Sequence, residues 1–285
     1  ALTPDELGAA LKADADVVVW REETVAAVAA RGGGRVHVKL DTGMGRLGTR
    51  DPHEATRVAE AAAAADGVEL VAAMTHFATA DELGDAFLDE QRERFEAWAA
   101  PLRERHPRLV LHAANSAALL RDAATHFDLV RAGVAVYGLD PFQEDAAARE
   151  LEPALVLTSY VAEVKRCARG ESAGYGRRFV AERDTVLATV PIGYGDGVRR
   201  ALTNNADGLV GGRRCPLVGT VSMDNVTLDL GPDGGGARTG DEVVLIGPGL
   251  PAEEMARRLQ TINYEITCAL TTRVARHHHR DGAPA

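Results

Sequence analysis

The chain has 285 residues, 46% of them hydrophobic and 26% charged, and its formal net charge is −10. This composition is ordinary for a globular protein with a well-buried core, and an acidic balance without a basic tract argues against a nucleic-acid partner. No apolar run reaches the roughly 18 residues of a membrane-spanning helix, and the acidic first residues predict no signal peptide.

Up to about residue 150, short apolar runs alternate with alanine-rich amphipathic segments. The apolar runs predict strands at 17–20, 36–40, 68–74 and 109–111, with shorter ones at 129–130 and 135–137. The segments between them predict helices at 22–30, 52–65, 85–104 and 117–123. Strict alternation of strand and helix indicates right-handed βαβ units and a parallel sheet.

After residues 152–153 the pattern changes to short β-rich runs separated by Gly, Pro and Asp turns. These runs cover 154–164, 185–191, 215–221, 225–230 and 242–246, with one helix expected near 251–259. We therefore predict an α/β protein with two domains, residues 1–150 and a mostly-β domain at 151–285. The first contains only about five barrel strands, where a closed (β/α)8 barrel of the TIM type needs eight. The expected fold is thus a partial barrel.

Polar motifs follow the strand ends of the first domain, where both a barrel and a doubly wound sheet place ligands. The clearest motif is the glycine-rich loop at 37–48, which presents Arg46 after an apolar strand. A guanidinium held there suits a carboxylate, a phosphate or a phenolate oxygen. A tight turn with a solvated arginine remains the alternative. The Gly-Lys-Ser/Thr sequence of a phosphate-binding P-loop is absent.

Cysteines and consecutive histidines bear on the cellular compartment and on metals. Cys167, Cys215 and Cys268 are scattered and form no CxxC pair, which favours a reducing cytoplasm. The histidines at 277–279 are adjacent in sequence and cannot share one helix face. We expect a solvated end there and no metal site.

Eight motifs in the two domains resemble those of a known enzyme family. In chain order they are KLDTGMGR (39–46), MTHFA (74–78), HAANS (112–116), RAGVAVYG (131–138), GYG (174–176), PIGYGDG (191–197), VSMD (221–224) and NYEI (263–266). Their order and spacing closely resemble alanine racemase, and the resemblance covers nearly the whole chain. It implies a barrel that binds pyridoxal 5'-phosphate (PLP), a C-terminal β domain and a homodimer with shared active sites. It also implies interconversion of L- and D-alanine through an aldimine with PLP, the D-alanine serving peptidoglycan.

The sequence departs from the family at the cofactor lysine. In the family this lysine lies after the first barrel strand, in a segment resembling Val-Lys-Ala-Asp-Ala-Tyr-Gly-His-Gly, and no such segment occurs here. Lys12 is followed by Ala-Asp-Ala but precedes the strand predicted at 17–20. We therefore expect a fragment that lacks roughly the first third of the family's length, consistent with the missing barrel strands, and that is inactive alone.

The resemblance implies catalytic roles for Tyr175, His76 and Arg131. Racemisation requires a base on each face of the α-carbon, and Tyr175 matches the family tyrosine that reaches the partner subunit's cofactor, with the absent lysine on the other face. A free tyrosine has a pKa of about 10, so His76, near Arg131, is expected to support it. Arg131 matches the arginine that faces the pyridine nitrogen and donates a hydrogen bond without giving up its proton. A strand-end histidine and an ion-paired surface arginine are the structural alternatives.

The resemblance also implies residues that bind cofactor and substrate. Ser116 and the backbone N–H groups of Gly133 and Val134 match the phosphate cradle, although Ser116 as a plain helix N-cap would look identical in sequence. Asn115 is a weaker candidate for the same cradle, and Tyr264 matches the phosphate-binding tyrosine.

Four further residues match positions around the substrate. Arg46 matches an arginine near the cofactor's phenolic oxygen and the substrate carboxylate. Lys39 matches a lysine that is carbamylated in many family members, an ordinary inward-facing lysine being the alternative. Met223 matches a carboxylate contact from the partner subunit, although core packing would explain a methionine equally well. Tyr194 matches the access channel.

Two other functions stay open on the sequence. A broader-specificity amino acid racemase of the same fold would carry the same motifs, because nothing in them fixes the pocket for alanine. An inactive fragment or a non-catalytic PLP-binding protein belongs to a different class. Single-domain cofactor carriers lack a β domain, so residues 153–276 argue against a carrier.

Overall fold

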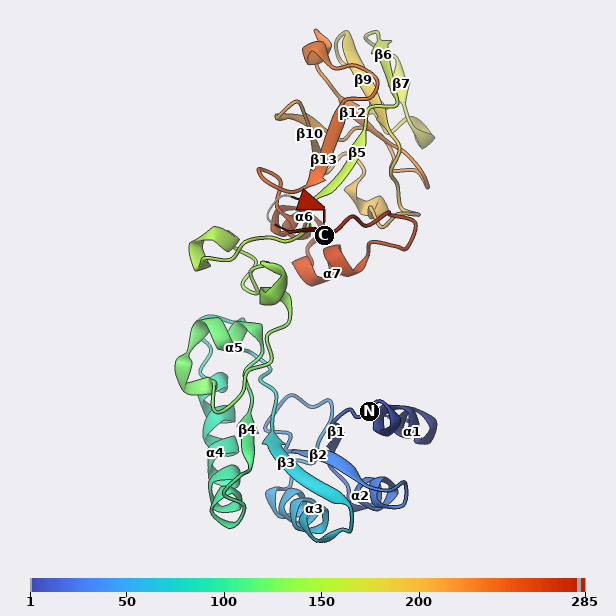
Figure 1. The fold of residues 1–285 in the computed structure, drawn as a ribbon. Helices are drawn as coiled ribbons and strands as arrows, with labels where there is room; N and C mark the ends of the chain where they lie inside the picture. The colour runs from blue at the N-terminus through green and yellow to red at the C-terminus, as the bar shows by residue number, and fades with distance from the viewer. Residues whose placement is uncertain (1, 281–282, 285) are drawn as a thin grey trace. The chain divides into compact units, whose positions relative to one another are not determined.

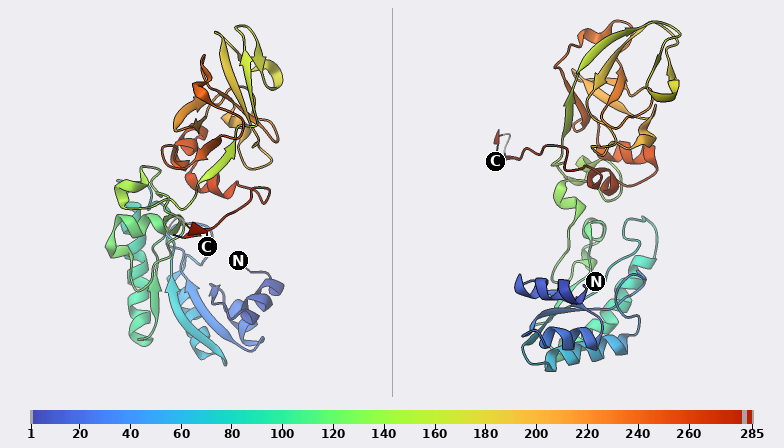
Figure 2. Two further views of the ribbon diagram at one scale, coloured as in Figure 1. Left: turned by 45° about the horizontal axis from the view of Figure 1, so that its top comes forward. Right: turned by 90° about the vertical axis from the view of Figure 1, so that its right-hand side faces the viewer.

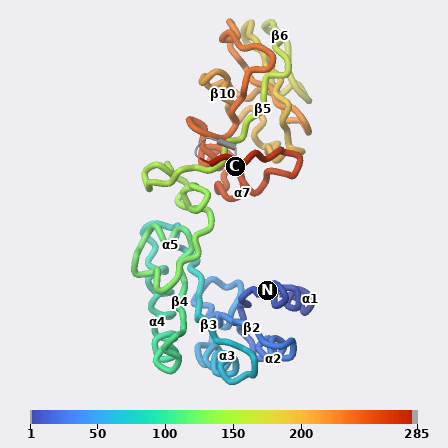
Figure 3. Tube along the Cα trace, in the orientation of Figure 1, coloured from blue at the N-terminus to red at the C-terminus, as the bar shows by residue number. Residues whose placement is uncertain are grey.

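The structure is a computed structural model that describes residues 2–280 and 283–284. Its contacts divide the chain into two compact units, Ala1–Gly133 and Val134–Ala285. Figure 1 shows both units with their elements labelled, and the tube in Figure 3 follows the chain through each of them. The domain boundary near residue 150 stays a prediction, and Val134 and Leu139 lie in the core of the second unit.

The first unit alternates helices and strands and holds one parallel sheet in the order β1-β2-β3-β4. Because each strand lies beside the next one in sequence, all four strands end at one edge, as consecutive βα units require. The elements are α1 (Pro4–Lys12), β1 (Val17–Val19), α2 (Glu22–Ala29), β2 (Gly34–Lys39), α3 (Pro52–Ala64), β3 (Val68–Met74), α4 (Phe87–Arg105), β4 (Val110–His112) and α5 (Ser116–Arg121).

Local sequence explains where these helices begin. Thr3 caps α1 in a capping box with Glu6, and Asp51 caps α3 ahead of Pro52. Helices α2 and α3 contact each other and lie on the same side of the sheet, as the turned views in Figure 2 show. The α/β character predicted from the alternating pattern is confirmed.

Two predicted short strands are absent as strands. Residues 134–137 form a 3-10 helix (Val134–Tyr137), and Leu129 makes only an isolated bridge to His112. Val136 and Tyr137 are apolar yet exposed, so their side chains imitate a buried strand in the sequence without being buried. The strand predictions at 129–130 and 135–137 are therefore wrong.

The second unit is mostly β, as predicted. One sheet has the order β11-β10-β13-β5 and the other β12-β9-β6, and all pairings are antiparallel. Their strands are β5 (Leu157–Tyr160), β6 (Glu163–Cys167), β9 (Thr185–Val190), β10 (Asp207–Val210), β11 (Arg213–Pro216), β12 (Val226–Asp229) and β13 (Glu242–Ile246). Short pairs add β7 (Ser172–Ala173) with β8 (Phe179–Val180), and β14 (His279–Arg280) with β15 (Ala283–Pro284). The helices are α6 (Ala252–Leu259) and α7 (Asn263–Cys268).

Strand β10 and helix α7 have no counterpart among the predicted elements. Gly208 in the middle of β10 weakens a strand prediction, but the structure shows why glycine is there. A Cβ at Gly208 would lie 2.8 Å from Leu228 Cδ1, across the core of the unit. No helix among the described residues is both long and apolar enough to cross a membrane.

Candidate active site

The predicted residues of the first unit gather at the carboxyl edge of its parallel sheet. Lys39 is the last residue of β2 and His112 the last of β4, while Thr75 and His76 directly follow β3. Residues far apart in sequence therefore meet at one edge. Gln91 of α4 is fully buried and joins two of these loops, donating to the Thr42 hydroxyl (3.1 Å) and to the carbonyl of His76 (3.2 Å).

Arg131 lies at the centre of this edge. Its Nη1 donates to Nδ1 of His112 (2.7 Å), and its Nη2 contacts Nδ1 of His76 (3.0 Å) and the carbonyls of Thr75 and Ala113 (2.9 Å each). All four acceptors are neutral groups. The ion-paired surface arginine considered as an alternative is therefore not what the structure contains.

Burial and positive charge keep both histidines neutral. Burial, with Arg131, Arg46 and Lys39, lowers the pKa of His76 to about 4. Burial, with Arg131 and His37, lowers the pKa of His112 to about 3. Burial also lowers the pKa of Arg131 to about 10, which still leaves the guanidinium protonated at neutral pH.

Lys39 adds a second buried cation to the edge. Its side chain is 5% exposed, and within the described chain no carboxylate forms an ion pair with it. Burial, followed by the charges of Arg46 and Arg131, lowers the pKa of Lys39, while Asp41 acts in the opposite direction. The Asp41 carboxylate already accepts from the backbone N–H groups of its own loop. Arg46 itself is exposed on that loop.

The structure separates the roles of Asn115 and Ser116. Asn115 is the N-cap of α5 and accepts from the N–H of Ala118 (2.9 Å). Ser116 is the first helical residue, and its Oγ accepts from the N–H of Gly133 (2.8 Å). The capping role considered for Ser116 thus belongs to Asn115. Ser116 and Gly133 of the predicted cradle lie together.

In the second unit, the loop at 219–225 connects three of the predicted residues. The Thr220 hydroxyl donates to the carbonyl of Tyr175 (2.6 Å), the N–H of Tyr194 donates to Ser222 (3.0 Å), and that of Gly195 donates to Met223 (2.9 Å). A Cβ at Gly193 would lie 2.3 Å from the Ser222 oxygen, so the two loops require glycine there.

The side chains on these loops point to solvent. Tyr175 is 74% exposed, Met223 51% and Tyr194 44%. The core-packing alternative for Met223 is therefore wrong in this chain. Backbone hydrogen bonds fix the positions of the three Cα atoms, and no hydrogen bond to a described residue fixes the ends of the three side chains.

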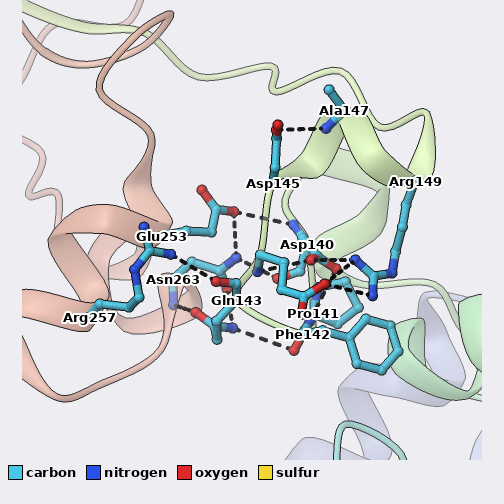
Figure 4. A network of polar contacts seen from close by, with 11 residues as sticks. Asp140, Pro141, Phe142, Gln143, Asp145, Ala147, Arg149, Glu253, Arg257 and Asn263 are labelled. Atoms are coloured by element: carbon cyan, nitrogen blue, oxygen red, sulfur yellow. Dashed lines mark hydrogen bonds and ion pairs between the residues drawn. The ribbon is translucent and has the colours of Figure 1, made fainter. Parts of the chain in front are cut away.

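Tyr264 lies on α7, directly after Asn263, whose backbone and side chain are held by hydrogen bonds. Asn263 is fully buried, and its Nδ2 donates to the Asp140 carbonyl and to Glu253 Oε1 (2.8 Å each). Gln143 Oε1 accepts from the backbone N–H of Asn263 (2.7 Å), and Figure 4 shows these side chains converging. The network fixes the backbone from which Tyr264 projects. Val134 is buried in the core of the same unit.

The residues at the sheet edge suit an anionic, hydrogen-bond-accepting ligand. Lys39 and Arg131 are buried or half-buried there, and neither contacts a carboxylate in the part of the chain that the structure describes. A guanidinium has five N–H donors, and the contacts of Arg131 engage Nη2 and one hydrogen of Nη1. Its Nε–H and second Nη1–H have no acceptor among the described residues. These donors fit a ring nitrogen such as that of PLP.

Comparison with known proteins agrees with this chemistry. Residues 1–141 match the family described as "Alanine racemase, N-terminal domain", and residues 154–278 match "Alanine racemase, C-terminal domain". The alanine racemase of Frankia casuarinae is 44% identical over 95% of this chain and 74% of its own length.

The chain belongs to the alanine racemase family. The alanine racemase of Symbiobacterium thermophilum is also 44% identical, over 85% of this chain, but the match covers 65% of that protein. The chain thus spans about two thirds to three quarters of the length of these curated relatives.

Solved alanine racemases share the fold. The biosynthetic alanine racemase of Pseudomonas aeruginosa matches with a TM-score of 0.88 and 36% identity, covering 98% of this chain and 77% of that one. The Bacillus anthracis alanine racemase with bound L-Ala-P matches with a TM-score of 0.87 and 34% identity, covering 100% and 75%.

Two residues at the sheet edge, His112 and Gln91, were not predicted from the sequence as parts of the site. His112 stands in the HAANS motif at the end of a predicted strand, so its position was a usable signal. Gln91 stands within the charged run 89–94 of a helix, where it looks like a solvated residue, and only its burial shows its role. Lys12, the lysine in the family-like tripeptide context, ends α1 ahead of β1, as its position in the sequence predicted.

Proposed function

We propose that the protein interconverts L- and D-alanine with pyridoxal 5'-phosphate as cofactor, in the cytoplasm, as a homodimer with shared active sites. The observation that carries the proposal is the excess of positive charge around Arg131, with Lys39 and Arg46 beside it. The cofactor's phosphate and phenolic oxygen and the carboxylate of alanine are anionic and would offset that charge. The D-alanine formed would serve peptidoglycan.

When bound, PLP supplies an electron-withdrawing ring that acidifies the α-proton of an attached amino acid. Arg131 would face the ring nitrogen and donate a hydrogen bond from an N–H that its present contacts leave unengaged. Because its pKa of about 10 keeps it protonated at neutral pH, Arg131 does not transfer that proton to the ring. An unprotonated ring withdraws electrons more weakly, which would favour racemisation over side reactions.

Exchange of the α-proton between faces needs two bases. Tyr175 of one subunit would serve one face of the substrate bound to its partner. The family's cofactor lysine, for which this sequence has no matching segment, would serve the other face. His76 accepts from Arg131 at Nδ1, so in its neutral form its Nε2 carries the proton. That N–H would donate to the Tyr175 oxygen and stabilise the phenolate that accepts the α-proton.

Lys39 would be carbamylated. Burial and neighbouring cations lower its pKa, which increases the fraction of neutral amine. The neutral amine would attack CO2, forming an N–C bond and releasing a proton. The resulting anion would offset the charge of Arg131 and orient Arg46, which would contact the phenolic oxygen and the substrate carboxylate.

The remaining predicted residues would hold cofactor and substrate. Ser116, the N–H groups of Gly133 and Val134, and Tyr264 would bind the phosphate. Asn115 would contribute by capping α5 and so placing Ser116. Met223, through its backbone N–H, and Tyr194 would serve the substrate carboxylate and the access channel of the partner subunit.

An activity assay tests the proposal on a chimaera. The N-terminal part of the Frankia casuarinae relative, up to the residue aligned with the start of this chain, would be fused to the 285 residues. We expect D-alanine to form from L-alanine when PLP is added. Tyr175→Phe should slow α-deuterium exchange from one enantiomer by about 10²–10⁴-fold. Tyr160→Phe, which alters an exposed tyrosine of β5, should leave both directions unchanged.

Equal and small losses in both directions for Tyr175→Phe would contradict its role as one of two bases. If the chimaera folds and binds PLP but racemises serine or lysine faster than alanine, the assignment of alanine as the substrate would be wrong. As a check on the motif alignment, the 285-residue chain can be mixed with PLP and reduced with borohydride. Stoichiometric labelling of Lys12 would show that the carried-over residue roles are misplaced.

A further inference from the structure

A line of hydrogen bonds leads from Arg131 across the sheet to Asp16, ahead of β1. Nδ1 of His112 contacts Arg131 Nη1 at 2.7 Å, and Nε2 of His112 contacts Nδ1 of His37 at 3.0 Å. Nε2 of His37 contacts Asp16 Oδ2 at 3.0 Å. Asp16 is held in turn by Arg35, whose Nε lies 2.5 Å from Oδ1.

The sheet register makes this line possible. His37 lies on β2 and His112 on β4, with β3 between them. Ala72 of β3 is the registered neighbour of both His37 and Val110, and His112 follows Val110 by two residues on the same face. The small side chain of Ala72 leaves room for the two imidazoles, whose ring centroids are 5.0 Å apart.

Donor and acceptor counting fixes the direction of every bond. A guanidinium only donates, so Nδ1 of His112 must accept from Arg131. A neutral imidazole has one acceptor and one donor nitrogen, so Nε2 of His112 carries the proton and donates to Nδ1 of His37. Nε2 of His37 then donates to Asp16. A doubly protonated His37 would require His112 to accept at both nitrogens, which a neutral ring cannot do.

Each link prevents a ring flip in the next. An imidazole turned by half a rotation about its Cβ–Cγ bond presents a carbon where Nδ1 had been. Asp16 holds the ring of His37 in the orientation that offers Nδ1 to His112, and that bond holds His112 in the orientation that offers Nδ1 to Arg131. His112 is 2% exposed, so a lost acceptor there would not be replaced by bulk water.

We propose that Asp16 and His37 are positioning residues for Arg131, acting through His112 along a line whose protons all point toward Asp16. The hydrogen-bond order concerns this chain alone. Its consequence for the reaction rests on the proposed function, in which Arg131 faces the cofactor ring.

Nuclear magnetic resonance of the 15N-labelled 285-residue chain at neutral pH, without cofactor, tests the direction. A scalar coupling across the N–H···N bond should link His112 Nε2, which bears the proton, to His37 Nδ1. A coupling should also link Arg131 Nη1 to His112 Nδ1. A proton bonded to His37 Nδ1, or no coupling between the two rings, would overturn the proposal.

A matched pair of variants tests the positioning role. Asp14 and Asp16 both pair with Arg35, but only Asp16 contacts a histidine. Asp16→Ala should speed the exchange of the His112 ring N–H with water by about tenfold, as expected for loss of a hydrogen bond to a charged group. Asp14→Ala should change it by less than about twofold, because that variant removes an exposed ion pair and no contact to a histidine.

Asp16→Asn supplies the conservative comparison, since its amide oxygen can still accept from His37. In Asp16→Asn, the His112 ring N–H should exchange with water nearly as slowly as in the parent chain. This variant also tests the proposal if Asp16→Ala does not fold. Equal effects of Asp14→Ala and Asp16→Ala would mean that Asp16 acts only through Arg35, which overturns the proposal. Because these readouts need neither cofactor nor substrate, a failure here is distinct from a failure of the racemase activity.

Discussion

The two units prepare their site residues differently. In the first unit, the side chains of Arg131, His76 and His112 are buried or half-buried, and both histidines are hydrogen-bonded to Arg131. In the second unit, Tyr175 and Met223 have bonded backbones and exposed side chains. The first arrangement sets the charge of Arg131 and the positions of the histidine protons in the absence of a ligand. The second fixes only the positions of the loops.

This difference shows what each unit fixes by itself among its own candidate residues. The first unit sets the donor direction at Arg131 and the neutral state of its histidines. The second unit offers the Tyr175 phenol, which no side chain among the described residues orients. Under the proposed function, a second copy of the chain would supply the surroundings of Tyr175, which is a reason for the exposure.

Acid titration should separate the two units most strongly. His76 and His112 have pKa values of about 4 and about 3 in the folded chain, against 6.5 unperturbed. As the pH falls below 6.5, these two histidines therefore become protonated in the unfolded chain while they are still neutral in the folded chain. The free energy of unfolding of the first unit should fall between pH 6.5 and about 4, with an uptake of about one proton per histidine.

Tryptophan fluorescence measures this effect, because both tryptophans, Trp20 and Trp98, lie in the first unit. Urea unfolding at several pH values gives the proton uptake as a slope. His76→Gln should lower the uptake by about one proton. An unchanged slope in that variant would show that His76 is not held neutral.

Arg131→Leu should give the largest effect of a single substitution. It leaves four acceptors without their donor, including the fully buried carbonyls of Thr75 and Ala113. The free energy of unfolding, followed by tryptophan fluorescence in urea, should fall by about 3 kcal/mol. Arg46→Leu removes an exposed arginine of the same charge cluster and should change it by less than about 0.5 kcal/mol. Equal losses would mean that charge, not hydrogen bonding, makes Arg131 important for stability.

In CO2-free buffer, where Lys39 is not carbamylated, Lys39→Met should act in the opposite direction. Lys39 is a buried cation near two arginines, so its charge costs free energy in the folded state. Its removal should raise the free energy of unfolding by about 1 kcal/mol at neutral pH. The gain should shrink as the pH rises from the lowered pKa of Lys39 toward 10.5, where the unfolded chain also loses the proton. A variant that is less stable than the parent chain at neutral pH would contradict this account.

Tyr175→Phe should give the smallest effect on stability. Its side chain is 74% exposed, so the free energy of unfolding of the second unit should change by less than about 0.5 kcal/mol, by calorimetry. Asn263→Ala, in the buried network of the same unit, should cost about 2 kcal/mol and serves as the contrast. A large loss for Tyr175→Phe would mean that its hydroxyl has a partner within the chain.

Local pattern was sufficient for most of the fold. The alternation of apolar runs and alanine-rich segments predicted the four strands and their helices in the first unit, and the turn-rich second half predicted a mostly-β unit. It failed at 135–137, because exposed apolar side chains look like buried ones in sequence. It also failed at β10, because the close approach of Leu228 that explains Gly208 is a tertiary contact.

The sequence by itself indicated the family and supplied a list of candidate site residues, since eight ordered motifs carry that information. Only the tertiary structure decided how those residues act together. Asp16, His37, His112 and Arg131 lie far apart in the sequence. The pairing of β1 with β2, the register of β2, β3 and β4, and the segment after β4 together bring their nitrogens and oxygens within hydrogen-bond distance. The direction of their protons follows from that geometry, because each donor dictates the state of the next ring.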